Sequence, residues 1–190
     1  PRQKRNVKRH KSVDFQQVPE LIRLVKGCSS LAVSRLAMEF LILTASRTKE
    51  VLEATWHEVD EDKNLWVLPV ERTKTGREHR VPLTTRMKEI LSEAKSLSPH
   101  AELIFASPTT GLSLSYNTLL HVLQKRIGSE ATVHGFRSSF KDWAAETTNF
   151  ANEVSEMALS HKISNPVEAA YRRGDLLEKR RELMNAWEDF

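Results

Sequence analysis

Six side chains of this 190-residue chain have the types, and stand in the local sequence contexts, that a reaction at a phosphodiester requires. They are Arg47, Lys74, His134, Arg137, His161 and Tyr171. The tyrosine supplies a nucleophile, and the other five supply positive charge and hydrogen-bond donors for phosphate oxygens. Because all six occur together in an ordered series, they predict a site that cuts DNA through a tyrosine.

The two arginines are predicted to grip the phosphate. Attack on phosphorus builds negative charge on the non-bridging oxygens, so catalysis depends on positioning and on cations. A guanidinium suits this task because its planar fork binds two phosphate oxygens and keeps its charge. Arg47 follows an apolar segment, where we expect it to point into a polar cavity; the alternative is an ordinary surface arginine at a helix junction.

His134 and Arg137 stand three residues apart at the start of a predicted helix, so they are expected to share a face near its positive end. Thr132 is the candidate cap of that helix. A helix N-terminus that carries a histidine and an arginine on one face can hold a phosphate. The alternative for His134 is a hydrogen-bonded structural role.

The remaining three residues complete the expected chemistry. Lys74 lies in a predicted turn, from which it could protonate a departing 5′ oxygen or simply be solvated. His161 could hydrogen-bond the phosphate, and the alternative is a capping or surface histidine. Tyr171 needs cationic neighbours to favour its phenolate, because the usual pKa of a phenol is about 10. Tyr116, the other tyrosine, lacks such neighbours in sequence and is expected to pack against the core.

The positive charge is concentrated at the N-terminus. The whole chain has a formal net charge of +4, but beyond residue 11 it holds 23 basic against 25 acidic residues, a formal charge of −2. This basic arm is predicted to attract double-stranded DNA, and the alternative is a solvated terminus. Its six candidate DNA-binding residues are Arg2, Lys4, Arg5, Lys8, Arg9 and Lys11.

Hydrophobic periodicity predicts a mainly α fold with a small antiparallel β-sheet, an α+β architecture. Two strands are expected at 64–70 and 78–83, joined through a turn at 73–76 that contains Lys74, with 103–105 as a possible third strand. Thr48 is the candidate N-cap of the third helix. Helices are expected at 15–27, 31–45, 48–54, 84–97, 115–126, 133–148, 152–159, 166–172 and 175–188.

Length and composition favour one globular domain. The sequence predicts a basic linker or arm at 1–14 and a single domain at 15–190, with no apolar segment long enough to span a bilayer. One cysteine, Cys28, and no visible secretory signal favour a cytoplasmic location. The first residue is Pro1, so we expect a piece of a longer protein. A metal nuclease is disfavoured because no His, Asp and Glu cluster has ligand spacing, and no cofactor is expected.

The segments around these residues resemble the catalytic domain of the tyrosine recombinase, or phage integrase, family, and are most similar to integrases of satellite phages and genomic islands. Residues 44–52 resemble the first-arginine box, and 74–83, ending in Val-Pro-Leu, the hairpin-lysine box. His134 and Arg137 match the His-x-x-Arg box. The segment around Tyr171, with the following Arg180 and Arg181, is similar to the nucleophile box and tail.

The resemblance implies a mechanism and a role for each residue. Tyr171 attacks phosphorus to form a 3′-phosphotyrosyl link, and a 5′-hydroxyl leaves. Arginines 47 and 137 clamp the phosphate, Lys74 acts as general acid, His134 handles the tyrosine proton, and His161 steadies a phosphate oxygen. Glu50 matches an acid that gives structural support. Ser46 stands where the family usually has a small residue, and Ser160 replaces the common glycine before His161, which could alter how that histidine is presented.

The resemblance also implies further domains and partners. Family members carry N-terminal DNA-binding domains that are absent from this chain, bind attachment sites on DNA, and assemble as homo-tetramers. The apolar stripe formed by Leu176, Leu183 and Trp187 is expected to pack either on a neighbouring protomer or on its own domain. Two alternatives remain: a type IB topoisomerase-like activity that relaxes supercoiled DNA, and a catalytically inactive DNA-binding remnant.

Overall fold

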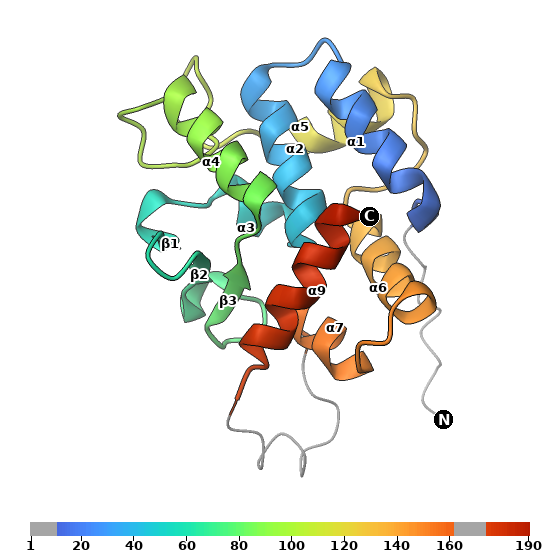
Figure 1. The fold of residues 1–190 in the computed structure, drawn as a ribbon. Coiled ribbons are helices and arrows are strands. Elements are labelled where there is room, and N and C mark those ends of the chain that lie inside the picture. The colour runs from blue at the N-terminus through green and yellow to red at the C-terminus, as the bar shows by residue number, and fades with distance from the viewer. Residues whose placement is uncertain (1–10, 162–173) are drawn as a thin grey trace, which may run out of the picture.

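The protein is mainly helical, and its small sheet lies at one edge of the helices (Figure 1). The structure, a computed structural model, describes residues 11–161 and 174–190. The prediction of a mainly α fold with one small antiparallel sheet is confirmed. The α-helices are α1 (Val18–Gly27), α2 (Ala32–Thr44), α3 (Thr48–Leu52), α4 (Thr85–Leu97), α5 (Asn117–His121), α6 (Gly135–Thr147), α7 (Asn152–Ala158) and α9 (Leu177–Asp189).

Helix α2 forms the centre of the core. Its side chains from Val33 to Thr44 are buried except Arg35, which is typical of a helix that is apolar all round and covered on every side. Helices α1, α4, α5 and α9 all contact it, and Figure 1 shows it between α1 and α4. The C-terminal end of α2 is therefore held in place by packing, and it positions the residues that follow it.

The sheet has three antiparallel strands in the order β1 (Val59–Asp60), β2 (Leu65–Leu68) and β3 (His79–Pro82). Strand β2 is shorter than expected because Pro69, which has no N–H to donate, follows Leu68. Strands β2 and β3 are joined by a longer connection than a tight hairpin, which includes the 3₁₀ turn η3 (Val70–Arg72).

The expectation of a third strand at 103–105 is wrong. Leu103 forms only an isolated bridge with Thr55, and the third strand is β1. Ile104 and Phe105 are apolar because they enter the core, where the Phe105 ring lies 5.4 Å from that of Phe40. A short run of apolar residues indicates that the segment is buried. Whether it forms a strand depends on a neighbouring strand with which it can pair, and the sequence pattern does not show such a partner.

Smaller differences have local causes. The first expected helix begins as the 3₁₀ turn η1 (Phe15–Gln17), where the Asp14 carboxylate accepts the Gln16 N–H. The helix expected at 115–126 is α5 followed by the π-helical turn η4 (Val122–Arg126). Tyr116 was expected in the core and is instead 68% exposed.

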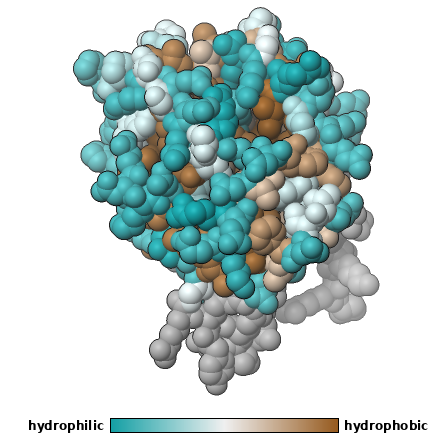
Figure 2. All heavy atoms as spheres, viewed as in Figure 1, coloured by the Kyte–Doolittle hydropathy of each residue, from teal (hydrophilic) through white to brown (hydrophobic). Residues whose placement is uncertain are grey.

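The C-terminal helix packs on its own domain. Leu183, Met184 and Trp187 are buried, and the Trp187 indole N–H donates to the Ile42 carbonyl at 3.0 Å. The Trp187 ring also lies 4.9 Å from Trp143. Hydrophilic side chains dominate the face that includes α9, with apolar ones interspersed (Figure 2). The apolar stripe of α9 is therefore covered within this chain.

Residues 11–14 are part of the fold, although the sequence pattern placed them in an arm. Val13 is buried, and the Lys11 carbonyl accepts the Thr132 N–H at 3.0 Å. Arg2, Lys4, Arg5, Lys8 and Arg9 lie outside the described residues. Within the described part of the chain, no helix is both long and apolar enough to cross a membrane.

Candidate active site

Arg137 connects the C-terminal ends of two helices. Its Nη1 donates to the carbonyl of Ala45, the C-cap of α2, at 2.6 Å, and its Nη2 donates to that of Leu159, the C-cap of α7, at 2.5 Å. Carbonyls at helix C-termini lack partners within their helix and carry partial negative charge. The two carbonyls therefore fix the guanidinium in place and offset part of the cost of burying it.

Arg47 contacts the next carbonyl along the chain, in the short loop of residues 159–161 at the end of α7. Its Nη2 donates to the carbonyl of Ser160 at 3.4 Å, directly after the Leu159 carbonyl that Arg137 contacts. The two guanidiniums, which lie far apart in the sequence, therefore converge on one short loop. Burial, and next the positive charge of Arg47, lower the pKa of Arg137 to about 10.

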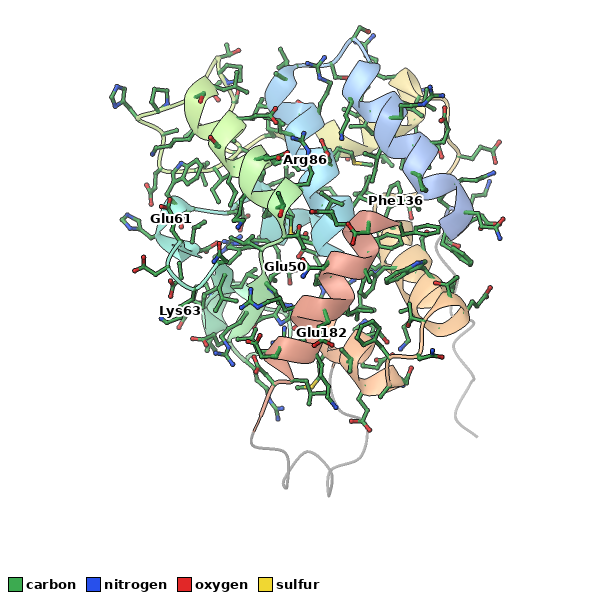
Figure 3. The ribbon with its side chains drawn as sticks, in the orientation of Figure 1. Glu50, Glu61, Lys63, Arg86, Phe136 and Glu182 are labelled. Atoms are coloured by element: carbon green, nitrogen blue, oxygen red, sulfur yellow. The ribbon has the colours of Figure 1, made fainter. Side chains whose placement is uncertain are left out.

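The corner between α2 and α3 positions Arg47. Ala45 ends α2 with a left-handed φ of 48°, and Arg47 is the N-cap of α3, so the expectation that Thr48 caps this helix is wrong. Glu50, the third residue of α3, closes a capping box: its carboxylate accepts hydrogen bonds from the Arg47 backbone N–H and from its side-chain Nη1, each at 2.8 Å. Figure 3 labels Glu50 between the sheet and α9 in that view. The structural support predicted for Glu50 is thus present.

Helix α6 begins at the residues expected from the His-x-x-Arg pattern. The N-cap of α6 is His134, so the expectation that Thr132 caps this helix is wrong, although the Thr132 hydroxyl accepts the Gly135 N–H at 3.2 Å. His134 precedes the helix and is exposed, whereas Arg137, one turn later, is 5% exposed. Of the two residues predicted to share a face of this helix, Arg137 is therefore buried and His134 lies at the surface.

Steric crowding explains why the residue after His134 is a glycine, Gly135. A Cβ built on it would meet the Lys11 carbonyl oxygen at 2.5 Å and the Ser12 Cα at 2.8 Å. No real side chain tolerates such distances from backbone, so a glycine is required where the N-terminal segment crosses the start of α6.

His161 lies on the loop that both arginines contact. Its Nδ1 is 2.7 Å from Glu156 Oε2, and its side chain is 41% exposed. Ser160, which replaces the family's common glycine, has a left-handed φ of 50°, the conformation that favours glycine. Its hydroxyl is 3.3 Å from that of Thr75. The substitution keeps the glycine-like backbone and adds a side-chain contact to the turn of Lys74.

Lys74 is exposed in the turn before β3. The neighbouring Thr75 contacts Ser160, and the Thr73 hydroxyl closes the turn by accepting the Arg77 N–H at 3.2 Å. The turn therefore lies against the loop of His161, although no contact fixes the ammonium of Lys74 itself among the residues described.

His79 is a member of the site that sequence reasoning missed. It begins β3 and is partly buried. Burial first, and then the positive charges of Arg180, Arg137 and Arg47, lower the pKa of His79 to about 3. Its imidazole is therefore neutral and shares an environment with Arg47 and Arg137.

A second missed group anchors the chain four residues after Tyr171. The Asp175 carboxylate pairs with Arg80 of β3 at 2.6 Å and with Arg180 of α9 at 2.5 Å. Arg180 is 1% exposed and also donates to the Arg80 carbonyl at 2.5 Å. Tyr171 itself lies outside the described residues. Repeated arginines at 180 and 181 were the available signal, but their partners are distant in sequence.

The chain matches one protein family over most of its length. Residues 11–175 match the model of the phage integrase family. The prophage integrase IntA of Escherichia coli K12 is 33% identical over 180 residues, covering 94% of this chain and 43% of that protein. The integrase of Enterobacteria phage P4 is 28% identical over 189 residues, covering 90% and 43%. The chain thus spans under half the length of these relatives.

Solved structures show the same fold. The lambda integrase catalytic core matches with a TM-score of 0.61 at 24% identity, covering 81% of this chain and 96% of that one. The integrase of mycobacterium phage Brujita matches with a TM-score of 0.69 at 16% identity, covering 100% of this chain and 61% of that one. With its ordered motifs, converging arginines and matching family model, this chain belongs to the phage integrase family.

Proposed function

We propose that this chain is the catalytic domain of a site-specific DNA recombinase that cleaves and rejoins strands through a 3′-phosphotyrosyl intermediate at Tyr171. The observation that carries the proposal is the convergence of Arg47 and Arg137 on the adjacent carbonyls of Leu159 and Ser160. Two cations held in one place, in a member of the phage integrase family, fit the need to neutralise a phosphate during attack at phosphorus.

Each residue has a proposed step. The Tyr171 phenol oxygen forms a bond to phosphorus while the bond from phosphorus to the 5′ oxygen breaks, and His134 takes the phenol proton. Lys74, in the exposed turn beside the loop, gives a proton to the departing 5′ oxygen. His161 donates to a phosphate oxygen. Rejoining reverses these steps with a 5′-hydroxyl as nucleophile.

Arg137 remains charged during these steps. A pKa of about 10 keeps Arg137 protonated near neutral pH. Each guanidinium has five N–H donors, and the bonds to Ala45, Glu50, Leu159 and Ser160 use two on each arginine. We assign the other donors to phosphate oxygens.

Double-stranded DNA and further copies of the protein are the proposed partners. Solved relatives of this fold include a lambda integrase dimer bound to a COC′ core site and a tetramer bound to a Holliday junction. We extend a DNA substrate and a tetrameric assembly to the longer protein of which this chain would be the catalytic part, acting in the cytoplasm.

A nicked suicide substrate tests the proposal. Its cleaved fragment diffuses away, so the covalent protein–DNA adduct accumulates and is seen as a shifted band on a denaturing gel. The expected result is an adduct with the unmodified protein and none with Tyr171→Phe, whose DNA affinity should stay within a few fold because only one hydroxyl is removed. Adduct formation by the Phe variant would contradict the assignment of the nucleophile.

The same substrate separates the alternatives. A catalytically inactive DNA-binding remnant would bind DNA and give no adduct with the unmodified protein. A type IB topoisomerase-like enzyme would give an adduct and would also relax a supercoiled plasmid that lacks any attachment site. A recombinase should form the adduct preferentially on its own attachment site.

A further inference from the structure

Glu156 lies between His161 and Lys141, two side chains that can carry a positive charge. Its Oε2 is 2.7 Å from His161 Nδ1, and its Oε1 is 2.6 Å from Lys141 Nζ. Glu156 belongs to α7, whereas Lys141 belongs to α6, one turn after Arg137. The carboxylate therefore connects the helix of the buried arginine to the loop of the exposed histidine.

Lys141 holds this carboxylate in a defined position. Its ammonium also donates to Asn152 Oδ1 at 2.5 Å and to Ser155 Oγ at 2.8 Å, both on α7. Partial burial opposes the charge of Glu156, but hydrogen bonds from Lys141 and His161 outweigh it and lower the pKa of this carboxyl. Glu156 is therefore ionised near neutral pH and can act as an acceptor for both neighbours.

An ionised carboxylate at Nδ1 determines which nitrogen of the ring is left for other partners. A carboxylate only accepts hydrogen bonds, so Nδ1 must carry a proton, and Nε2 is the nitrogen that can face a ligand. His161 is exposed, and the residue before it, Ser160, accepts a hydrogen bond from Arg47. The Nε2 edge of the imidazole thus belongs to the loop on which the two guanidiniums converge.

We propose that Glu156 is a positioning residue for strand cleavage: its carboxylate accepts the Nδ1–H of His161 and orients the ring so that Nε2 meets the phosphate held by Arg47 and Arg137. This inference rests on the proposed function, because it assigns the orientation of His161 during that reaction. The competing explanation is a purely structural ion pair between Glu156 and Lys141 that joins α6 to α7.

Three variants distinguish orientation from simple support. Glu156→Ala removes the acceptor, Glu156→Gln keeps an oxygen that can accept the Nδ1–H, and Glu146→Ala removes an exposed glutamate of α6 as a matched control. With saturating suicide substrate we expect Glu156→Ala to form adduct about tenfold more slowly, the equivalent of about 1.4 kcal/mol. Glu156→Gln should recover much of that loss, and the control should match the unmodified protein.

Two results would overturn the inference. One is an equal loss in the Ala and Gln variants, which would indicate that the ion pair to Lys141 matters. The other is a loss that persists when His161 is already replaced: in a His161→Ala background, Glu156→Ala should cost no more than about a further twofold, since a positioning residue has nothing left to position.

A readout independent of activity keeps the inference testable. In protein with ¹⁵N-labelled histidine, the imidazole nitrogen shifts of His161 should report a proton on Nδ1 in the unmodified and Gln proteins and a mixed tautomer in Glu156→Ala. Unchanged shifts in the Ala variant would contradict the inference. If the unmodified protein forms no adduct, the proposed function fails, while these shifts still decide whether Glu156 sets the tautomer.

Discussion

Arg137 is a buried cation that lies near a second cation, an arrangement that costs free energy in the absence of a phosphate. Burial and repulsion by Arg47 both act against its charge, which is why its pKa is lowered to about 10. The carbonyls of Ala45 and Leu159 stabilise it in place. A phosphate that binds between the arginines would remove the repulsion, so the cost of assembling the site favours binding of an anion.

The lowered pKa of His79 leads to a prediction about the stability of the fold at acidic pH. Its pKa is about 3 in the fold against an ordinary value of 6.5, so between these values the unfolded chain binds a proton that the folded chain does not. The free energy of unfolding should therefore fall on acidification through this window, with a slope from this residue approaching about 1.4 kcal/mol per pH unit. Urea unfolding of His79→Gln at several pH values should show a flatter dependence than the unmodified protein.

His100→Gln provides the control for this measurement, because it makes the same exchange at an exposed histidine. Carboxylates titrate in the same window in all three proteins, so the difference between them isolates His79. An identical slope in His79→Gln and in the unmodified protein would show that His79 gains its proton as readily in the fold as in the unfolded chain.

At the level of the elements, the crossing of the N-terminal segment over α6 determines the start of that helix. The Lys11 carbonyl accepts the Thr132 N–H, and Gly135 leaves room for the backbone of residues 11 and 12. Because α6 carries Arg137, this crossing also helps to position that guanidinium.

Gly135→Ala should destabilise the protein. The added Cβ would meet backbone atoms at 2.5 and 2.8 Å, so the segment must shift, at a cost of about 1–3 kcal/mol for an overpacked site. Thermal unfolding should show a lower midpoint. Gly27→Ala is the control: a Cβ there meets nothing within 4 Å, and alanine in a helix is favoured over glycine by up to about 1 kcal/mol. A Gly135→Ala variant as stable as Gly27→Ala would contradict the steric argument.

Helix α9 contributes to the site through its first turn and to the core through its last. Arg180 joins Asp175 and the Arg80 carbonyl, while Trp187 donates to Ile42 and packs against Trp143. The chain that follows Tyr171 is thus attached to β3 of the same molecule.

For the molecule as a whole, the distribution of charge predicts how DNA is attracted. Residues 1–10 contain five of the six arm cations, and the sixth, Lys11, pairs with Glu130 at 2.9 Å on the surface. Removal of residues 1–10 leaves Lys11 and its contacts to Thr132 in place. The truncated protein therefore tests the arm and keeps the described contact between residue 11 and the segment before α6.

The truncation should weaken DNA binding and reduce its dependence on salt. Each phosphate contact contributes about 0.9 to the slope of log affinity against log salt, so loss of several contacts should lower the slope by several units. Fluorescence anisotropy over a salt series measures this. A full-length variant with the five cations replaced by Gln should behave like the truncation. An unchanged slope in either protein would show that the arm does not contact DNA.

The amino-acid sequence predicted the parts of this protein that depend on near neighbours. Helical periodicity predicted α2 and α6, alternation predicted β2 and β3, and the order of motifs predicted the family. The support given by Glu50 followed from the resemblance, and its contacts are to Arg47, only three residues away. These features were readable because a helix or a cap is determined by residues within about one turn of each other.

Only the tertiary structure shows which groups the site residues contact. Arg137 lies 92 residues from Ala45, Thr75 85 from Ser160, and Arg80 95 from Asp175. No periodicity links positions so distant, and the same is true of the arginines that lower the pKa of His79. Burial and charge depend on what the folded chain brings together around a group, so the environment of the site emerges only once α2, α6, α7 and β3 have packed.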